Sequence, residues 1–458
     1  MLQPSKSAEI VRIEIDPEQR HQTIEGFGCS INAWTAPHYA LYYDDAFTDF
    51  AVEELGLSVF RLQMWGGVTP AEVPDWREIR HQEFRWTGEG LRGKMNVDWA
   101  KRIVARNPEV KIIGSVWSAP AWMKENASRT GTRSGYLLDP KRDFDHDNRL
   151  RVDRYQHFAK WIVEWARYME AQGTPFFALS LQNELMFTQW FESTLYTPSE
   201  YARIVETTGA MFEAEGVRKP LFFGPEDMTL ANYDDAVRHR PYVDALLESD
   251  AARYFDALAT HGYSDGVRSD AHNDAVAYWR SVAHLGKPYW ITEGGSGEHA
   301  WPEPVLTGIA PRLHLALVGA NVSLFTGWQL ASNEGKASEH EFMDWKTPTA
   351  KTYATMHFWR HVRPGAVRVE ASVPESAGLL ASAFTHERRG ESVVVLINRT
   401  SRPLTAEVHW PGIERWIAYR TDETLRHAPI DDSSATEPNG RFVLPGPSIV
   451  TAIGRKQP

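Results

Sequence analysis

Two glutamates, Glu184 and Glu293, have the residue type and setting that cleavage of a glycosidic bond requires. Glu184 follows the apolar run Phe176–Leu181 and comes directly after Asn183, and Glu293 ends the run Pro288–Thr292. Both runs are typical of buried strands, so the two carboxyl groups can face each other across a pocket. One carboxyl would then donate a proton, and the other would attack the anomeric carbon or activate water.

Such a pair needs secondary-structure elements that position it. Between residues 20 and 362, short apolar runs alternate regularly with longer amphipathic segments. We predict strands in the short apolar runs, at Gly26–Ile31, Ser58–Gln63, Val110–Val116, Phe176–Leu181, Pro220–Phe223, Ala257–Thr260, Pro288–Thr292 and Asn321–Trp328. We predict helices in the longer amphipathic segments, at Ala46–Leu55, Val97–Arg106, Asp153–Ala171, Pro198–Glu215, Tyr242–Leu247, Ala271–His284, Val305–Val318 and Thr349–His361. Eight alternations indicate an α/β fold, a (β/α)8 TIM barrel.

The pattern changes after residue 362 to short β-rich segments separated by turns. These segments are Val393–Asn398, Ala406–Trp410, Trp416–Arg420, Arg441–Leu444 and Ile449–Ile453. They are typical of an antiparallel β-sandwich, and Ile10–Ile15 alternates in the same style. We therefore predict a catalytic barrel at 20–362 and an accessory β-sandwich domain formed by 1–19 together with 363–458.

A barrel places its active site where the carboxyl ends of the strands meet their loops. Polar and aromatic residues fall at these ends, and we predict that the substrate is bound by Arg61, Trp117, Asn183, His261, Tyr263 and Trp328. The pKa values of the two glutamates must differ for the chemistry to work. We expect Arg61 and Tyr263 to keep Glu293 ionised, and aromatic neighbours such as Trp117 to keep Glu184 protonated.

The aromatic content supports a carbohydrate substrate. The chain has 18 Trp, 16 Tyr and 20 Phe, and several tryptophans stand in polar, loop-like surroundings: Trp65, Trp117, Trp122, Trp190, Trp301, Trp328 and Trp345. Flat amphipathic rings suit the apolar faces of sugars, while their N–H groups reach hydroxyls. Any one of these tryptophans can instead belong to the core, so only the set as a whole favours a carbohydrate cleft.

Charge and cysteine content narrow the possible partners. The formal charge of −11 argues against nucleic acid and against an anionic membrane surface. The single cysteine, Cys29, excludes an internal disulfide and a cysteine zinc cluster, and a buried apolar role suits it best. Met1–Ile10 lacks the apolar core of a signal peptide, so we expect a cytoplasmic protein unless a signal was removed. We expect no metal and no cofactor, and the sequence leaves the oligomeric state open.

Several segments spread over the chain resemble glycoside hydrolase family 30. They are Gln22–Gly28, Trp117–Lys124 (Trp-Ser-Ala-Pro-Ala-Trp-Met-Lys), Gln182–Glu184, Trp290–Glu293 and Lys351–Arg368. The resemblance implies a retaining barrel glycosidase in which Glu184 is the acid/base, Glu293 is the nucleophile and Asn183 binds the sugar 2-hydroxyl. It also implies a β-sandwich built from the C-terminal strands and the N-terminus.

The resemblance does not identify the substrate of this chain. Members of the family act on glucosylceramide, xylan, β-1,6-glucan or β-1,6-galactan. In this family a proline commonly follows the Asn-Glu pair, whereas this chain has Leu185. The subfamily therefore stays open.

Two other classes are the alternatives. A metal-dependent barrel hydrolase would need an early His-x-His and further ligands at strand ends, but the 17 histidines are scattered. A sugar-binding barrel without catalysis would have no need for both carboxylates. On a retaining mechanism we expect the carboxyl groups about 5–5.5 Å apart, and about 6.5–9.5 Å would indicate inversion.

Overall fold

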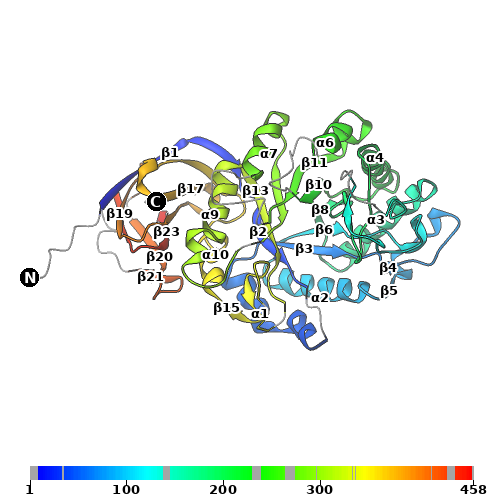
Figure 1. The fold of residues 1–458 in the computed structure, drawn as a ribbon, viewed down its shortest axis with the longest axis horizontal. Coiled ribbons are helices and arrows are strands. Elements are labelled where there is room, and N and C mark those ends of the chain that lie inside the picture. The colour runs from blue at the N-terminus through cyan, green and yellow to red at the C-terminus, as the bar shows by residue number, and fades with distance from the viewer. Residues whose placement is uncertain are drawn as a thin grey trace, which may run out of the picture.

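The protein was analysed as a computed structural model that describes residues 9–32, 36–137, 145–228, 239–263, 274–295, 297–332, 334–335, 337–413, 415–430 and 439–455. Eight parallel strands close a barrel, which confirms the predicted fold (Figure 1). They are β2 (Gly26–Ser30), β3 (Val59–Met64), β6 (Lys111–Val116), β8 (Phe176–Ser180), β10 (Leu221–Met228), β11 (Phe255–His261), β12 (Tyr289–Glu293) and β13 (Val322–Gln329). Short two-stranded sheets pair β4 (Val68–Thr69) with β5 (Arg85–Trp86), β7 (Gly135–Tyr136) with β9 (Phe187–Thr188), and β14 (Met343–Asp344) with β15 (Thr347–Pro348).

Helices connect and cover the strands. They are α1 (Asp45–Asp49), α2 (Gly90–Arg106), α3 (Tyr155–Ala171), α4 (Pro198–Ala214), α6 (Arg240–Leu247), α7 (Asp274–Val282), α8 (Glu303–Leu306), α9 (Ile309–His314) and α10 (Ala350–Trp359). Helix α4 begins with a capping box, in which Thr197 and Glu200 satisfy each other's backbone N–H groups, and Pro198 occupies the first turn. These local signals explain why its start was predictable.

The helix expected over Val97–Arg106 begins earlier, as α2 at Gly90, and the helix expected over Ala46–Leu55 is α1 followed by a π-turn. Two further differences have a clear local cause. The helix expected over Val305–Val318 is divided into α8, α9 and a π-turn, because Gly308 separates α8 from α9. The fifth strand was predicted to end at Phe223, but β10 continues to Met228 through a cis Gly224–Pro225 bond. Proline followed by two acidic residues looks like a loop in the sequence, and the barrel nevertheless encloses them.

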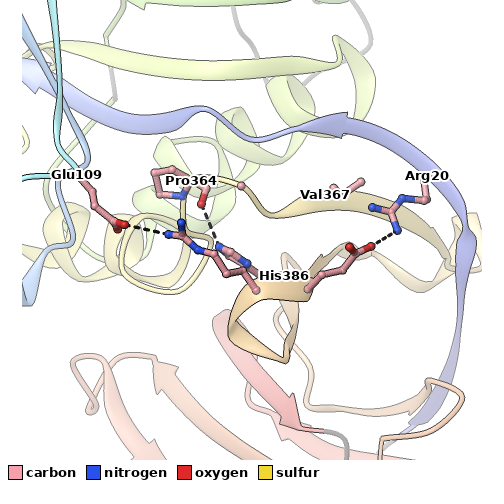
Figure 2. Close-up of a pocket in the computed structure, with 8 residues that line it drawn as sticks. Arg20, Glu109, Pro364, Val367 and His386 are labelled. Carbon is pink, nitrogen blue, oxygen red and sulfur yellow. Dashed lines mark hydrogen bonds and ion pairs between the residues drawn. The ribbon is translucent and has the colours of Figure 1, made fainter.

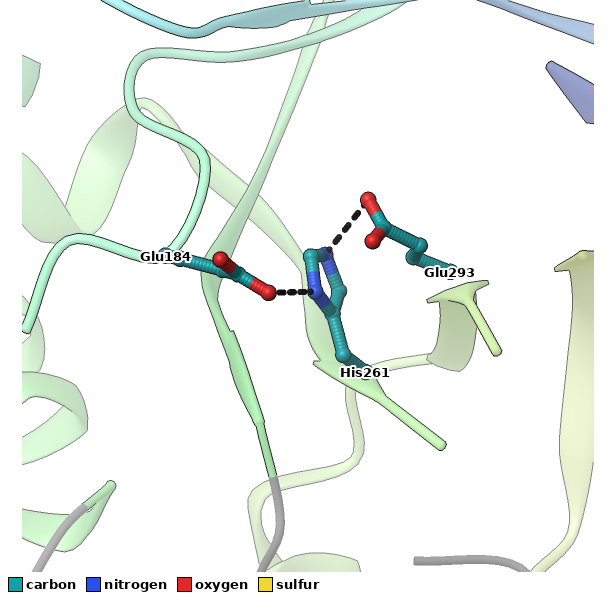
Figure 3. Close-up of side chains that lie close together, drawn as sticks. All are labelled: Glu184, His261 and Glu293. Carbon is teal, nitrogen blue, oxygen red and sulfur yellow. Dashed lines mark hydrogen bonds and ion pairs between the residues drawn. The ribbon is translucent and has the colours of Figure 1, made fainter. Parts of the chain in front are cut away.

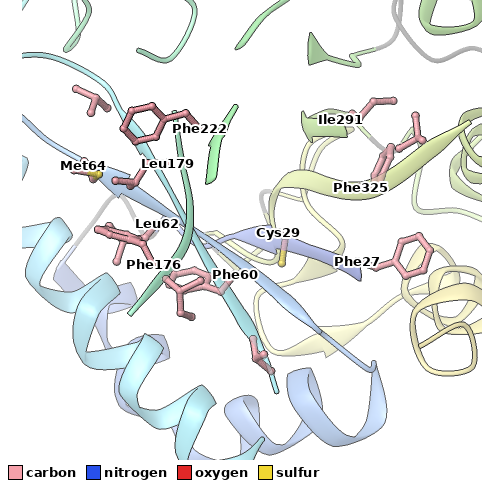
Figure 4. Close-up of a cluster of buried hydrophobic side chains, with 14 of the residues drawn as sticks. Phe27, Cys29, Phe60, Leu62, Met64, Phe176, Leu179, Phe222, Ile291 and Phe325 are labelled. Carbon is pink, nitrogen blue, oxygen red and sulfur yellow. The ribbon is translucent and has the colours of Figure 1, made fainter. Parts of the chain in front are cut away.

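Apolar side chains pack on both the inner and the outer face of the barrel wall. Val59, Ile113, Phe223, Trp290 and Leu324 form a compact inner cluster. Outward-facing side chains such as those labelled in Figure 4 pack against the helices. Cys29 is among them with no exposed surface, and burial raises the pKa of its thiol well above the ordinary value. Its predicted apolar role fits this position.

The second domain is a nine-stranded, mostly antiparallel sheet at the left of Figure 1. In spatial order its strands are β21 (Ala428–Ile430), β20 (Arg415–Thr421), β23 (Ser448–Arg455), β18 (Glu391–Asn398), β17 (Leu379–His386), β16 (Val367–Ser372), β1 (Glu9–Thr23), β19 (Leu404–His409) and β22 (Asn439–Leu444). The N-terminal strand joins it as predicted, and its pairing with β19 is parallel.

This sheet curls until its two ends face each other. Trp416 on β20 and Phe442 on β22 are near opposite ends of the strand order, yet their ring centroids lie 5.9 Å apart. Both belong to a separate apolar core with Ile13 and Leu396. The sheet therefore encloses a core between two halves of itself, as a sandwich does.

The two domains share a polar joint (Figure 2). Arg388 of the second domain pairs with Glu109 of the barrel domain at 2.9 Å. Beside this contact and within the second domain, Arg20 on β1 pairs with Glu387 at 2.7 Å and His386 approaches the Pro364 carbonyl at 3.0 Å. The predicted boundary between residues 19 and 20 falls inside β1, and the boundary positions stay predictions. Within the described ranges, no helix has both the length and the apolar character to cross a bilayer.

Candidate active site

Glu184 and Glu293 meet at the carboxyl end of the barrel. Glu293 is the last residue of β12, and Glu184 lies four positions after the end of β8. Their side chains point toward each other on either side of His261 (Figure 3), and a carboxylate oxygen of each lies within 4.8 Å of the other. The two residues are 8% and 4% exposed, so the facing pair is almost enclosed by protein.

Arg61 on β3 organises the floor below this pair. Its Nη1 donates to Glu293 Oε2 at 2.7 Å, and its Nη2 donates to Asn183 Oδ1 at 2.7 Å. Nε and Nη2 both donate to Glu226 Oε1, and the guanidinium lies 4.7 Å from the Trp117 ring. Because Arg61 has no exposed surface, it positions other side chains from below and does not line the cavity.

Glu226 was missed by the sequence analysis. It stands on the part of β10 that was not predicted, is fully buried, and pairs with Arg61. Burial alone would raise its pKa, but Arg61 and His261 lower it to about 2. The available signal was Pro225-Glu226-Asp227 directly after an apolar run, which resembles the setting of Glu184 and Glu293.

His261 ends β11 and lies between the carboxylates. Its Nδ1 is 3.1 Å from Glu184 Oε1, and its Nε2 is 3.5 Å from Glu226 Oε1 and 3.8 Å from Glu293 Oε2. Burial opposes the charged form, but the carboxylates, Glu293 foremost, raise its pKa to about 10. His261 is therefore an imidazolium at neutral pH, fully buried like Arg61.

The cluster holds one more negative charge than positive. Arg61 and His261 face the carboxylates of Glu184, Glu226 and Glu293. Burial and the neighbouring Glu184 raise the pKa of Glu293, against the opposing effect of His261, Arg61 and the Tyr263 hydroxyl. A single proton on the facing pair makes the cluster neutral, which is the state a proton donor and a nucleophile need together.

The expected contacts of Glu293 are opposed by its surroundings. The contacts predicted to keep Glu293 ionised are present, since Arg61 pairs with Oε2 and the Tyr263 hydroxyl donates to Oε1. They do not lower its pKa below the ordinary value, because the site is buried and a second carboxylate lies close.

Glu184 is held in an unusual backbone conformation. Its φ of 47° is in the left-handed region, which a non-glycine residue seldom adopts. Its N–H donates to the Glu226 carbonyl at 2.6 Å, and its own carbonyl accepts from Phe187 N at 2.9 Å. Gln189, a second residue that the sequence analysis missed, donates from Nε2 to Glu184 Oε2 at 2.5 Å. These bonds aim the carboxyl group into the cavity.

A cavity of about 540 Å³ opens above the pair. It is lined by Trp65, Glu89, Trp117, Asn183, Glu184, Phe187, Gln189, Phe191, Met228, Tyr263, Glu293, Trp328, Glu339 and His340. Trp117 lies 5.2 Å from Trp65 and 5.6 Å from Trp328 between ring centroids, so the three indoles form a continuous wall. Of the eight predicted site residues, six line the cavity, and Arg61 and His261 lie beneath it.

The oxygen and nitrogen atoms of Glu184, His261 and Glu293 are near enough to suggest a metal site. Binding a metal would require His261 to lose the proton that its carboxylate neighbours favour. Its two nitrogens also face different carboxylates. The trio is better explained as an ion and hydrogen-bond network.

Glu184 and Glu293 follow the fourth and seventh barrel strands, and comparison with known proteins identifies the barrel that carries them. The family model for the glycosyl hydrolase family 30 TIM-barrel domain matches residues 75–281. The chain carries a glycoside hydrolase family 30 TIM-barrel domain. It is thus a retaining β-glycoside hydrolase, in agreement with the resemblance noted in the sequence.

Relatives of this family 30 hydrolase differ in the substrates that their names state. Glucuronoxylanase XynC of Bacillus subtilis is 22% identical over 86% of this chain and 88% of its own length. An endo-1,6-beta-D-glucanase of Neurospora crassa is 22% identical over 91% of this chain and 87% of its own length. Mouse lysosomal acid glucosylceramidase is 22% identical over 90% and 82%, respectively.

Solved structures show the same fold. The family 30 subfamily 8 xylanase Xyn30A of Clostridium acetobutylicum superposes with a TM-score of 0.74 at 20% identity, over 97% of this chain and 99% of that one. The endo-beta1,6-glucanase BT3312 gives a TM-score of 0.70 at 20% identity, over 97% and 94%.

Proposed function

We propose that this hydrolase uses Glu293 as its nucleophile and Glu184 as its acid/base. The observation that carries the proposal is the facing pair, whose nearest carboxylate oxygens lie within 4.8 Å of each other. Carboxyl groups about 5–5.5 Å apart act by double displacement, whereas inverting enzymes keep them about 6.5–9.5 Å apart to admit a water molecule. The spacing supports a covalent glycosyl-enzyme intermediate.

The neighbours of each carboxyl group support these roles. Arg61 and Tyr263 bind the two oxygens of Glu293 and orient it for attack on the anomeric carbon. Glu184 accepts from Gln189 and lies on a segment that continues along the cavity wall. In the first step Glu293 bonds to the anomeric carbon while Glu184 gives its proton to the departing oxygen. In the second step Glu184 takes a proton from water, and that water releases the sugar from Glu293.

Asn183 is set to bind a sugar hydroxyl. A guanidinium can only donate, so the Asn183 atom that accepts from Arg61 must be the amide oxygen. The amide nitrogen is then the group left to donate, and Asn183 lines the cavity. This orientation supports a hydrogen bond to the sugar 2-hydroxyl, a contact that strengthens in the transition state.

The substrate that we propose is a β-linked oligosaccharide, polysaccharide or glycoside of the β-glucoside, β-xyloside, β-1,6-glucan or β-1,6-galactan type. The indole wall of Trp65, Trp117 and Trp328 suits the apolar face of such a sugar ring. Aryl β-glucoside, β-xyloside, β-galactoside and β-fucoside, tested beside xylan and β-1,6-glucan, would identify the sugar and the linkage.

Proton NMR of the first product anomer tests the mechanism. We expect the β-anomer to form first, because double displacement inverts the anomeric centre twice. Initial release of the α-anomer would contradict the proposal. Turnover that survives a chelator would exclude the metal-dependent alternative, and turnover itself would exclude a barrel that only binds sugar.

A further inference from the structure

The five-residue loop Gln189–Ser193, which follows β9, presents two aromatic rings to solvent beside the active site. Trp190 is 77% exposed, the largest value among the exposed large apolar residues of the described chain, and Phe191 is 47% exposed. Phe191 also lines the active-site cavity. Two adjacent exposed aromatic rings at the edge of a cleft provide an apolar surface of the kind that ligand-binding grooves present.

The loop is fixed at its first residue by the acid/base itself. Gln189 Nε2 donates to Glu184 Oε2 at 2.5 Å. The Gln189 carbonyl accepts from Gly131 N at 2.6 Å, and its N–H donates to Ser193 Oγ at 3.0 Å. The position of the loop is thereby tied to the position of the Glu184 carboxyl group.

The loop is fixed at its other end by a buried carboxylate. Glu192 is 2% exposed, and its two oxygens accept from Gly66 N at 2.6 Å and pair with Arg129 at 2.7 Å. The next residue, Ser193, accepts at its carbonyl from Lys124 Nζ at 2.6 Å. With both ends held, Trp190 and Phe191 cannot fold into the core without breaking these bonds, so their exposure is built into the fold.

The loop continues the segment that carries Glu184, and this indicates which part of the substrate Trp190 and Phe191 would contact. Glu184 protonates the oxygen of the leaving group, so the residues next to it lie on the leaving-group side of the cleft. Phe187, Gln189 and Phe191 line the cavity from this segment, whereas Tyr263 contacts the nucleophile Glu293. Phe187 is itself supported by Tyr136, whose ring centroid lies 4.5 Å away at an angle of 27°.

We propose that Trp190 and Phe191 form a platform that binds the first sugar ring of the leaving group, which makes this enzyme selective for saccharide leaving groups. The proposal rests on the assignment of Glu184 as acid/base. A sugar ring offers an apolar C–H face to the aromatic rings and hydroxyls to the cleft. The carboxylate of Glu89, which also lines the cavity, can accept from such hydroxyls.

A lipid leaving group fits these neighbours less well. An alkyl chain has no hydroxyl that could donate to the Glu89 carboxylate at the cavity wall. A saccharide can donate to this carboxylate and also contact the aromatic rings. The order of preference expected is therefore oligosaccharide over alkyl glycoside.

The test compares two substrates with the same reacting sugar, an oligosaccharide and a glycosyl fluoride, whose leaving group has no ring to bind. For Trp190→Ala and Phe191→Ala, we expect the oligosaccharide-to-fluoride ratio of kcat/KM to fall about 3- to 10-fold, the usual effect of one aromatic contact. Trp190→Phe should retain most of the ratio. Ile417→Ala, which removes an exposed apolar side chain on β20, is the matched control and should leave the ratio unchanged.

The outcomes separate the platform from the mechanism. An unchanged ratio in both alanine variants, or equal losses on both substrates, would overturn the platform. A selective loss on an octyl glycoside with no loss on the oligosaccharide would also overturn it and would indicate a lipid leaving group. Release of the α-anomer from the fluoride by the wild-type enzyme would instead contradict the assigned roles of Glu184 and Glu293. Interception of the intermediate by added oligosaccharide should fall in the alanine variants, because the same platform would bind the acceptor.

Discussion

Arg61 and Glu226 form an ion pair with a nitrogen–oxygen distance of 2.8 Å, and neither side chain has any exposed surface. The pair lies directly below the facing carboxylates and leaves Nη1 of Arg61 to bind Glu293. Glu226 thus fixes the direction of the guanidinium and compensates part of its charge. Removing one partner of such a buried pair typically costs about 3–5 kcal/mol of stability.

Glu226→Gln should move the pH profile of kcat/KM toward acid. The change removes the negative charge that partly compensates Arg61 and His261, so both cations lower the pKa of Glu293 further. We expect a loss of thermal stability as well. Glu226→Asp keeps the charge and is the control; we expect its pH profile to stay in place even if its rate falls. A shift toward alkali in Glu226→Gln would show that the charge argument is wrong.

Glu293→Ala should reduce kcat by roughly 10⁴-fold or more on every substrate, because the attacking group is lost. Azide is small enough to fill the space and attack the anomeric carbon directly. With an activated aryl β-glycoside, we expect azide to restore turnover and give an α-glycosyl azide. A β-glycosyl azide from this variant would mean that Glu293 is not the nucleophile.

Glu184→Gln should reduce turnover of natural glycosides by roughly 10²- to 10⁴-fold, the usual contribution of a general acid. Aryl glycosides with acidic phenols need less protonation, so formation of the intermediate should be spared on them. A plot of rate against leaving-group pKa measures this effect and should become steeper in the variant. Equal losses on good and poor leaving groups would count against Glu184 as the proton donor.

A buried histidine cluster should make the protein sensitive to acid. On one side of the joint between the domains, His361 Nε2 lies 2.9 Å from His427 Nε2, and both rings stack on Tyr419. Burial lowers the pKa of His361 to about 3 and that of His427 to about 4, and nearby positive charge adds to the effect. Below about pH 6.5 the unfolded chain binds protons that the folded chain does not, so stability falls as the pH drops toward 4.

Melting temperatures measured between pH 7.5 and pH 4 would check this expectation. His361→Gln keeps a nitrogen donor near His427 and should flatten the dependence of melting temperature on pH. The exposed His284→Gln is the matched control. A dependence as steep in His361→Gln as in the wild type would assign the acid sensitivity to other groups.

Much of the barrel was predictable because its strands are short apolar runs with clear turn signals. The elements that were not predicted have local causes. In the second domain, Leu379–His386 contains small alanine and serine residues, which are weak strand formers, and β17 was therefore not predicted. Residues 224–228 contain proline and two acidic side chains, and only the closed barrel explains why they continue β10.

The candidate site was predictable to the level of strand ends and no further. Arg61, Asn183 and Glu293 were expected at one rim, and parallel strands do bring them together. Sequence order cannot show that Arg61 and His261 lie under the cavity floor, because that depends on which face of each strand end points inward. Nor can it show that the Glu226 carboxylate contacts both Arg61 and His261 and compensates part of their positive charge.

The most direct test of the account is to trap the proposed intermediate. A 2-deoxy-2-fluoro glycosyl fluoride of the matching sugar should react with the enzyme and leave one fluorosugar attached, because the fluorine slows release more than formation. Mass spectrometry of the digested protein should find the label on Glu293, and Glu293→Ala should acquire none. Labelling of another carboxylate, or turnover of the fluoride with first release of the α-anomer, would contradict the double-displacement mechanism.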